Sequence, residues 1–152
     1  MKKQRLILEQ IDAKIAQLKK AENFVIPASG WVYSIRQALG MSMRQLGDKM
    51  RITPQSIKEI EEREKNGTIT IKGLRQFGHS LDLKLIYGFL PSDGSLEKII
   101  EKRAFELATE IVNRTSISMK LEDQENNPNR LHKAVKEKAE EIKLTMPKYL
   151  WD

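Results

Sequence analysis

The sequence contains no cysteine, which excludes disulfide bonds and thiolate metal sites. Its only two histidines, His79 and His132, lie in different segments, and neither has a companion at the spacing of a metal site. It has no glycine-rich loop that could cradle a phosphate, and no nucleophile can be paired with a base. We therefore expect a protein that is not an enzyme and that binds no metal or cofactor.

Long apolar runs are also missing, because none approaches the ~18 residues that a membrane-spanning helix needs. The basic opening, Met1-Lys-Lys-Gln-Arg, leads into a mixed pattern with Glu9 and Asp12 rather than into the apolar centre of a signal peptide. We expect a cytoplasmic protein without a membrane partner.

Aromatic residues make up only 6% of the 152 residues, so the core must be mostly aliphatic. Charged residues reach 32% and lie in Glu/Lys-rich stretches with apolar spacing, which favours helices over sheets. Lys and Arg outnumber Asp and Glu by 6 to 3 in residues 1–30 and by 10 to 6 in residues 31–91, but not in residues 92–152, where the counts are 11 and 12. A basic portion beside a neutral one is typical of a polyanion-binding head with a protein-facing remainder, although excess charge can also serve solubility alone.

The apolar periodicity predicts a mainly α fold in three regions. Residues 1–25 form an N-terminal helix, whose apolar stripe must pack either on this chain or on a second copy. Residues 31–91 form a domain of four to five helices that ends in one short β-strand. Residues 92–152 form a C-terminal helical region of two helices, separated by a polar stretch that includes Pro128.

Helix start signals follow one another closely between residues 31 and 82. Ser42-Met43-Arg44-Gln45 is a capping box, and Thr53-Pro54 combines an N-cap hydroxyl with proline at the first helical position. Asn66-Gly67 turns the chain, and Thr70 caps a further helix. Residues 42–63 therefore read as a helix, a tight turn and a second helix, and we expect that second helix to project from the body and enter the DNA major groove.

The exposed residues at the start of this second helix have plausible base partners. Gln55 suits adenine, Glu59 suits the cytosine amino group, Lys58 suits guanine, and Ser56 suits several bases. Thr53 and the free amides of the helix start suit a phosphate, as do the surrounding basic residues. Three carboxylates further along, Glu61, Glu62 and Glu64, are expected to face away. The side chains that we expect to contact DNA are Arg44, Arg51, Thr53, Pro54, Gln55, Ser56, Lys58, Glu59, Lys65, Lys72 and Arg75.

The segment Leu83–Leu90 alternates imperfectly, is rich in strand formers and ends at Pro91. No second strand candidate is obvious in the chain, so the same strand of another copy is an attractive partner. The alternative is an extended apolar tail that lies on the core. The candidate residues of such a dimer strand are Leu85, Ile86, Tyr87 and Phe89.

Residues 31–82 resemble the Cro/phage-repressor (XRE) helix-turn-helix family. The resemblance is carried by the run from Ile35 through Ser42 to Leu46, by Thr53-Pro54-Gln55-Ser56-Ile57, and by Glu61. In that family the first residues of the second helix contact bases, which here are Pro54, Gln55, Ser56 and Glu59. Pro54 departs from the usual polar residue, and the small residue usual in the middle of the preceding helix is Gly47 here, which costs some helix propensity. The resemblance implies a head of four or five helices, no cofactor, and a homodimer on a palindromic operator.

Most of the chain also resembles the mobile mystery protein A family, through the Ile26-to-Trp31 entry, the segment Leu85–Pro91 and the closing Leu150-Trp151-Asp152. Members of that family are paired with a Fic-domain partner, which implies an antitoxin that represses its own gene.

Fic enzymes are restrained by an inhibitory helix with the pattern Ser/Thr-x-x-x-Glu-Gly/Asn, whose glutamate blocks productive ATP binding. Ser118 and Glu122 match its hydroxyl and carboxylate positions, and Asp123 departs at the sixth. A spacing of four places both residues on one helix face. The alternatives to the antitoxin are an inhibitor of a Fic adenylyltransferase, a repressor unrelated to any toxin, and a helical protein without DNA affinity. In the last case Ser118 and Glu122 are only part of a solvated helix face.

Overall fold

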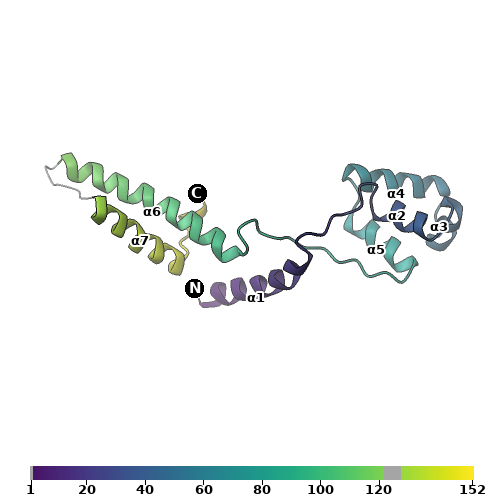
Figure 1. Ribbon diagram of the computed structural model, residues 1–152, viewed down its shortest axis with the longest axis horizontal. Coiled ribbons are helices and arrows are strands. Elements are labelled where there is room, and N and C mark those ends of the chain that lie inside the picture. Colours follow the sequence, from purple (N-terminus) through teal and green to yellow (C-terminus); the bar gives the residue numbers. More distant parts are fainter. Residues whose placement is uncertain (1, 122–127) are drawn as a thin grey trace. The chain divides into compact units, whose positions relative to one another are not determined.

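The computed structural model describes residues 2–121 and 128–152 and is mainly helical (Figure 1). Within these residues the chain forms seven α-helices and two short 3-10 helices, which make 73% of it helical. None of the described helices is both long and apolar enough to cross a membrane. The helices are α1 (Lys2–Leu18), α2 (Trp31–Ala38), α3 (Met43–Met50), α4 (Pro54–Asn66), α5 (Ile71–Ser80), α6 (Leu96–Leu121) and α7 (Pro128–Thr145), and the 3-10 helices are η1 (Lys19–Ala21) and η2 (Lys148–Trp151).

The chain divides into two compact units, which are described separately. One consists of Asn23–Tyr87 and holds α2 to α5. The other consists of Met1–Glu22 together with Gly88–Asp152 and holds α1, α6, α7 and both 3-10 helices. The N-terminal helix thus packs in the same unit as the C-terminal helices.

The unit of residues 23–87 is built around a small aliphatic core with one aromatic ring. Val32, Leu46 and Ile57 are fully buried, and Phe77 joins them from α5. Burying such side chains contributes roughly 1.5–3 kcal/mol each, before the entropic cost of ordering the chain. One residue from each of the four helices meets here, so this cluster fixes how α3 and α4 cross.

The helix starts in this unit are set by local side chains, and the predicted caps are confirmed. Ser42 and Gln45 form the complete capping box of α3. Thr53 Oγ1 accepts the Ser56 amide at the start of α4, with Pro54 as the first helical residue. Thr70 caps α5 through the Gly73 amide. The second helix of the pair continues to Asn66, beyond the expected end at Arg63, because the left-handed residue that ends it is Gly67.

The predicted β-strand is not formed in this chain. Residues 83–90 are neither helix nor strand, and the described residues contain no strand at all. A strand needs a neighbour to complete its hydrogen bonds, and no extended segment of the described chain pairs with this one. The alternation that suggested a strand is therefore present in an unpaired, extended stretch.

The second unit is a helical hairpin with α1 attached to it. Figure 1 shows α6 and α7 side by side and antiparallel, and α7 begins at Pro128 itself, which the sequence had placed inside the polar break. Ala104 and Ala108 of α6 are fully buried, which allows the close approach of α7, with Ile142 packed beside them. Leu8 of α1 joins the same core.

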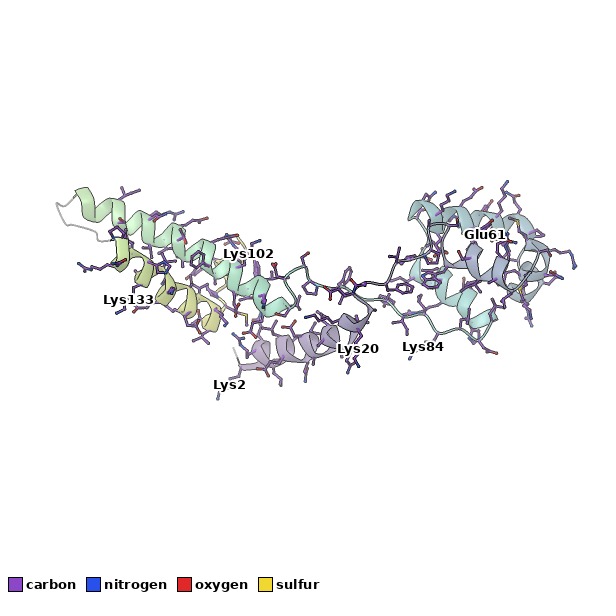
Figure 2. All side chains as sticks on the ribbon, in the orientation of Figure 1. Lys2, Lys20, Glu61, Lys84, Lys102 and Lys133 are labelled. Carbon is purple, nitrogen blue, oxygen red and sulfur yellow. The ribbon has the colours of Figure 1, made fainter. Side chains whose placement is uncertain are left out.

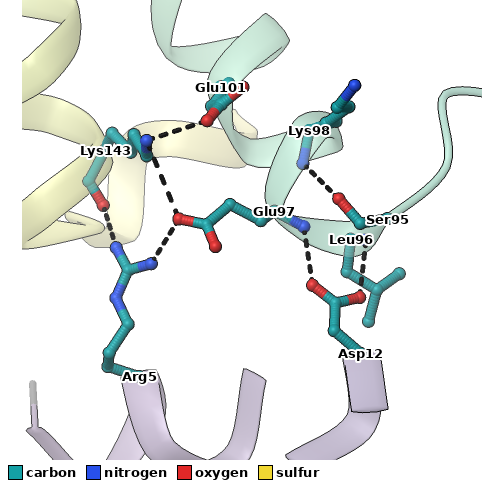
Figure 3. A network of polar contacts seen from close by, with 8 residues as sticks. All are labelled: Arg5, Asp12, Ser95, Leu96, Glu97, Lys98, Glu101 and Lys143. Carbon is teal, nitrogen blue, oxygen red and sulfur yellow. Dashed lines mark hydrogen bonds and ion pairs between the residues drawn. The ribbon is translucent and has the colours of Figure 1, made fainter. Parts of the chain in front are cut away.

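Polar contacts hold α1 to the hairpin (Figure 3). Arg5 donates to the Glu97 carboxylate at 2.7 Å and to the Lys143 carbonyl at 3.1 Å. The Lys143 ammonium donates to Glu101 at 2.8 Å, and this hydrogen bond raises the pKa of Lys143 above its ordinary value. The two oxygens of Asp12 accept the backbone amides of Leu96 and Glu97 at 2.8 and 3.2 Å, so a side chain of α1 caps the start of α6.

Candidate nucleic-acid interface

The connection between α3 and α4 is short and tightly packed. Arg51 adopts the left-handed conformation, with φ of 57°, and the Ile52 amide donates back to the Gly47 carbonyl at 2.9 Å. A Cβ on Gly47 would lie 2.7 Å from the Ile52 carbonyl oxygen, so the absence of a side chain at Gly47 lets the turn approach α3. Gly47, which costs helix propensity, therefore has a packing role.

The N-terminal end of α4 is on the surface. Thr53, Pro54 and Gln55 are exposed, while Ile57 one turn later is completely buried. Lys58 and Glu59 are exposed as well. The first turn of α4 thus presents polar side chains outward, while its apolar side is held in the core.

A groove of about 770 Å³ runs along one side of α4, between it, the end of α3 and α5. Its basic side chains come from three segments, and Glu59 is the only carboxylate among the lining residues. Glu59 lies 3.9 Å from the Arg63 guanidinium, so its charge is partly offset. The basic lining residues are Lys49, Arg51, Arg63, Lys72 and Arg75, with His79 beside them. Such a groove is complementary to a polyanion.

Arg75 is oriented within this groove by an aromatic neighbour. Its Nη2 donates to the Tyr87 hydroxyl at 3.3 Å, and its guanidinium carbon lies 5.7 Å from the centre of the Tyr87 ring. A stacked and hydrogen-bonded guanidinium loses fewer conformations when it binds a phosphate than a free one does. Tyr87 therefore positions a cation of the groove.

A buried ion pair fixes α4 against α2. Arg36 Nε donates to Glu61 Oε1 at 2.5 Å, Nη2 donates to Oε2 at 3.3 Å, and Nη1 donates to the Met41 carbonyl at 3.0 Å. Both side chains are less than a tenth exposed, and Glu61 is labelled in Figure 2. Glu61 does not line the basic groove, because its partner Arg36 holds the carboxylate in the interior.

Glu64 also lies outside the groove, where it caps the start of α2. The residue before α2 is Gly30, which has no side chain to cap the helix. Glu64 supplies the cap instead, because its two carboxylate oxygens accept the amides of Trp31 and Val32 at 2.7 and 2.8 Å. Glu62, the third of these carboxylates, is exposed.

The predicted DNA-contact residues do not all share one surface. Arg51, Ser56, Glu59, Lys72 and Arg75 line the basic groove. The exposed N-terminal residues Thr53, Pro54 and Gln55 precede Ser56 on α4. Lys58 and Lys65 line a separate hollow beside α2, together with Tyr33. Arg44, on α3, is exposed and paired with Asp48 at 3.1 Å.

Several polar lining residues of the groove were not predicted as DNA contacts from the sequence: Lys49, Arg63, Gln76, His79 and Ser80. The spacing of Lys72, Arg75, Gln76 and His79 places them on one face of α5, which is a signal that the sequence contains. It becomes informative only once the packing of α5 beside α4 is known. Among the described residues, no group of three or more histidine, aspartate or glutamate side chains is arranged to hold a metal ion.

The candidate Fic-inhibitory pair cannot be placed. Ser118 belongs to α6, and Glu122 lies outside the described residues. Of the candidate dimer-strand residues, Leu85 is half-buried and Ile86, Tyr87 and Phe89 are exposed.

Comparison of the chain with protein-family models, with curated proteins and with solved structures found no match.

Proposed function

We propose that this chain binds double-stranded DNA as a helix-turn-helix protein, with α4 as the helix that reads the major groove. The observation that carries the proposal is the exposed first turn of α4, which opens onto a groove with five Lys/Arg side chains and one carboxylate. Positively charged side chains around a projecting helix are the pattern by which such proteins fix their register on phosphates while the helix contacts base edges.

Within this proposal the side chains have separate tasks. Gln55 and Glu59, on the outer face of α4, read base edges, whereas Pro54 has no amide hydrogen to donate. Lys49, Arg51, Lys72 and Arg75 neutralise phosphates beside the groove. Lys58 and Lys65, on the other side of α4, contribute to the general positive field. The biological role that needs the fewest further assumptions is that of a cytoplasmic transcriptional repressor.

A matched pair of variants tests the proposal. Lys49→Ala/Lys72→Ala removes two exposed lysines from the groove, and Lys136→Ala/Lys148→Ala removes two exposed lysines from the other unit. The net charge changes equally in both. We expect fluorescence anisotropy with duplex DNA, including the region upstream of the chain's own gene, to show at least a tenfold loss of affinity in the groove variant and little change in the control. Equal losses in both would show that only net charge matters and would contradict the proposal.

The pairing with a Fic-domain toxin rests on the family resemblance alone. A pulldown with a Fic protein encoded beside this gene, comparing the native chain with Glu122→Gly, tests both the partner and the inhibitory motif. An unchanged level of adenylylation with the Glu122→Gly chain would show that Glu122 does not inhibit the Fic enzyme.

A further inference from the structure

The unit of residues 23–87 has an apolar cleft of about 290 Å³ besides the basic groove. Its walls come from α2, from α5 and from residues 83–86, which follow α5. Leu74 and Phe77 of α5 line this cleft, whereas Lys72 and Gln76 of the same helix line the basic groove. The two sites share no lining residue, so an occupant of the cleft leaves the basic groove open.

Two aromatic rings give the cleft a fixed wall. Phe77 is buried and belongs to the core of the unit. Trp31 is 36% exposed, and the ring of Phe24 stacks on it, with centroids 5.6 Å apart and an angle of 4° between the two planes. A ring that is already held in place loses little freedom when a ligand packs against it, and aromatic surface contributes strongly to binding.

The wall formed by residues 83–86 is anchored at its first residue. A Cβ on Gly78 would lie 2.6 Å from the Leu83 carbonyl oxygen, so the glycine lets the chain return closely against α5. The Leu83 amide donates to the Gly78 carbonyl at 2.8 Å. Beyond this anchor, no described residue forms a hydrogen bond with the backbone of residues 84–86. A ligand in the cleft therefore has unpaired backbone groups beside it as well as apolar side chains.

A single cation accompanies this apolar lining. Among the described residues that line the cleft, Lys84 carries the only charge. Its side chain is exposed, is labelled in Figure 2, and forms no hydrogen bond or ion pair with any residue of the described chain. An apolar concave site with one free ammonium group is complementary to a molecule that carries one negative charge on an apolar body.

We propose that this cleft binds a small apolar carboxylate, with its ring or short chain against Trp31 and Phe77 and its charge beside Lys84. The volume of the cleft lies at the small end of the range for small-molecule sites, which is roughly 300–1,000 Å³. A specific protein partner would instead need a contact of about 800 Å² on this surface, which is more than a cleft of this volume provides.

Occupancy of the cleft reaches the basic groove through Tyr87, a consequence that rests on the proposed function. Tyr87 directly follows the lining residues 83–86, and its hydroxyl accepts from Arg75 at 3.3 Å. A ligand that packs against residues 84–86 restricts this segment and keeps Tyr87 beside Arg75, so we expect it to strengthen DNA binding. Linkage requires DNA to strengthen binding of the ligand by the same factor.

A titration with 4-phenylbutyrate tests the site without DNA. The readout is Trp31 emission in the full-length Trp151→Phe chain, and we expect saturable binding with a dissociation constant below about 1 mM. The uncharged 4-phenylbutanol should bind about threefold more weakly, which is the size expected for a partly exposed ion pair. Lys84→Gln should abolish this difference between the two ligands, whereas Lys102→Gln, an exposed change in the other unit, should preserve it. Equal affinities for the two ligands in the chain with Lys84 would overturn the assignment of a carboxylate.

Leu85→Asp tests the location of the site. It places a carboxylate on the cleft wall and should abolish saturable binding of 4-phenylbutyrate. Leu85 lies outside the helices, so the helical content measured by circular dichroism should not change. Absence of saturable binding to the chain with Leu85, or binding that persists in a folded Leu85→Asp chain, would overturn the proposed site.

Fluorescence anisotropy with duplex DNA, with and without saturating 4-phenylbutyrate, tests the coupling. We expect the ligand to raise the DNA affinity of the native chain at least about fivefold and to leave that of the Leu85→Asp chain unchanged. An unchanged DNA affinity of the native chain would overturn the coupling, although the ligand site would stand on its own titration. A chain that binds the ligand but no DNA would contradict the proposed function and the coupling, and not the site.

Discussion

At the residue scale, the ion pair of Arg36 and Glu61 is the most demanding feature of the unit that carries α4. Two charges have been taken out of water, and their desolvation is offset only by close geometry and by the further hydrogen bond from Arg36 to the Met41 carbonyl. Such a pair contributes less to net stability than its short distance suggests. Removing one partner is costly, because the other charge then stays buried alone.

Glu61→Ala should accordingly lower the free energy of unfolding of this unit by about 3–5 kcal/mol. Urea unfolding followed by Trp31 fluorescence, in a Trp151→Phe background, measures the loss. Asp48→Ala is the control, because its pair with Arg44 is about 70% exposed and should matter by less than about 1 kcal/mol. Similar losses of unfolding free energy in both variants would contradict the conclusion that the buried pair fixes α4 against α2.

In the proposed function, recognition of a specific DNA sequence depends most on Gln55. It is exposed in the first turn of α4, and a Gln side chain can bind both polar atoms of an adenine edge. Gln55→Ala should therefore reduce discrimination at one or two base pairs, by about 1–3 kcal/mol each. Competition among systematically altered duplexes measures this, and Lys72→Ala should instead weaken all sequences about equally. A neutral Gln55→Ala on a mapped binding site would show that α4 is placed wrongly.

At the scale of elements, helix starts were predictable and side-chain partners were not. The caps at Ser42, Thr53 and Thr70 use residues within three positions of one another, so they are legible in the sequence. The partners of Glu61 and Glu64 were not predicted, because they lie 25 and 32–33 residues away. The strand expected at residues 83–90 is not formed, because the sequence contains the alternation of a strand but no second strand that could pair with it.

The groove beside α4 was predictable only in part. Arg51, Lys72 and Arg75 were found as isolated cations around an expected DNA-contact helix, whereas Lys49 and Arg63 were missed. Which cations share a surface depends on how α5 packs beside α4, and neither composition nor periodicity contains that information. The same packing separates Lys58 and Lys65 from the groove.

One carboxylate of α1, Asp12, contributes to its attachment to α6. Asp12 accepts two amides at the start of α6, and an N-cap of this kind is worth about 1 kcal/mol. Asp12→Ala should speed amide hydrogen exchange of α1 about fivefold, since about 1 kcal/mol changes an opening equilibrium by that factor. Glu9→Ala, an exposed change on the same helix, should leave exchange unaltered. Unchanged protection of α1 in the Asp12→Ala chain would mean that its apolar contacts suffice.

At the scale of the whole molecule, the chain combines a basic unit that exposes the start of α4 with a second unit, in which α1 packs on a nearly neutral hairpin. In our account the basic groove binds DNA. Tyr87 supports this role, because its hydroxyl and ring hold Arg75 in the groove.

The most direct test of the central claim attaches a DNA-cleaving iron–EDTA group to a single cysteine in the cysteine-free chain. With Gln55→Cys as the attachment point, we predict cleavage of both strands confined to a few base pairs of the bound site, with the offset of a reagent in the major groove. Lys136→Cys, on α7, should produce no such localised pattern. Absence of localised cleavage from position 55, under conditions where the labelled protein is bound to DNA, would contradict the entry of α4 into the groove.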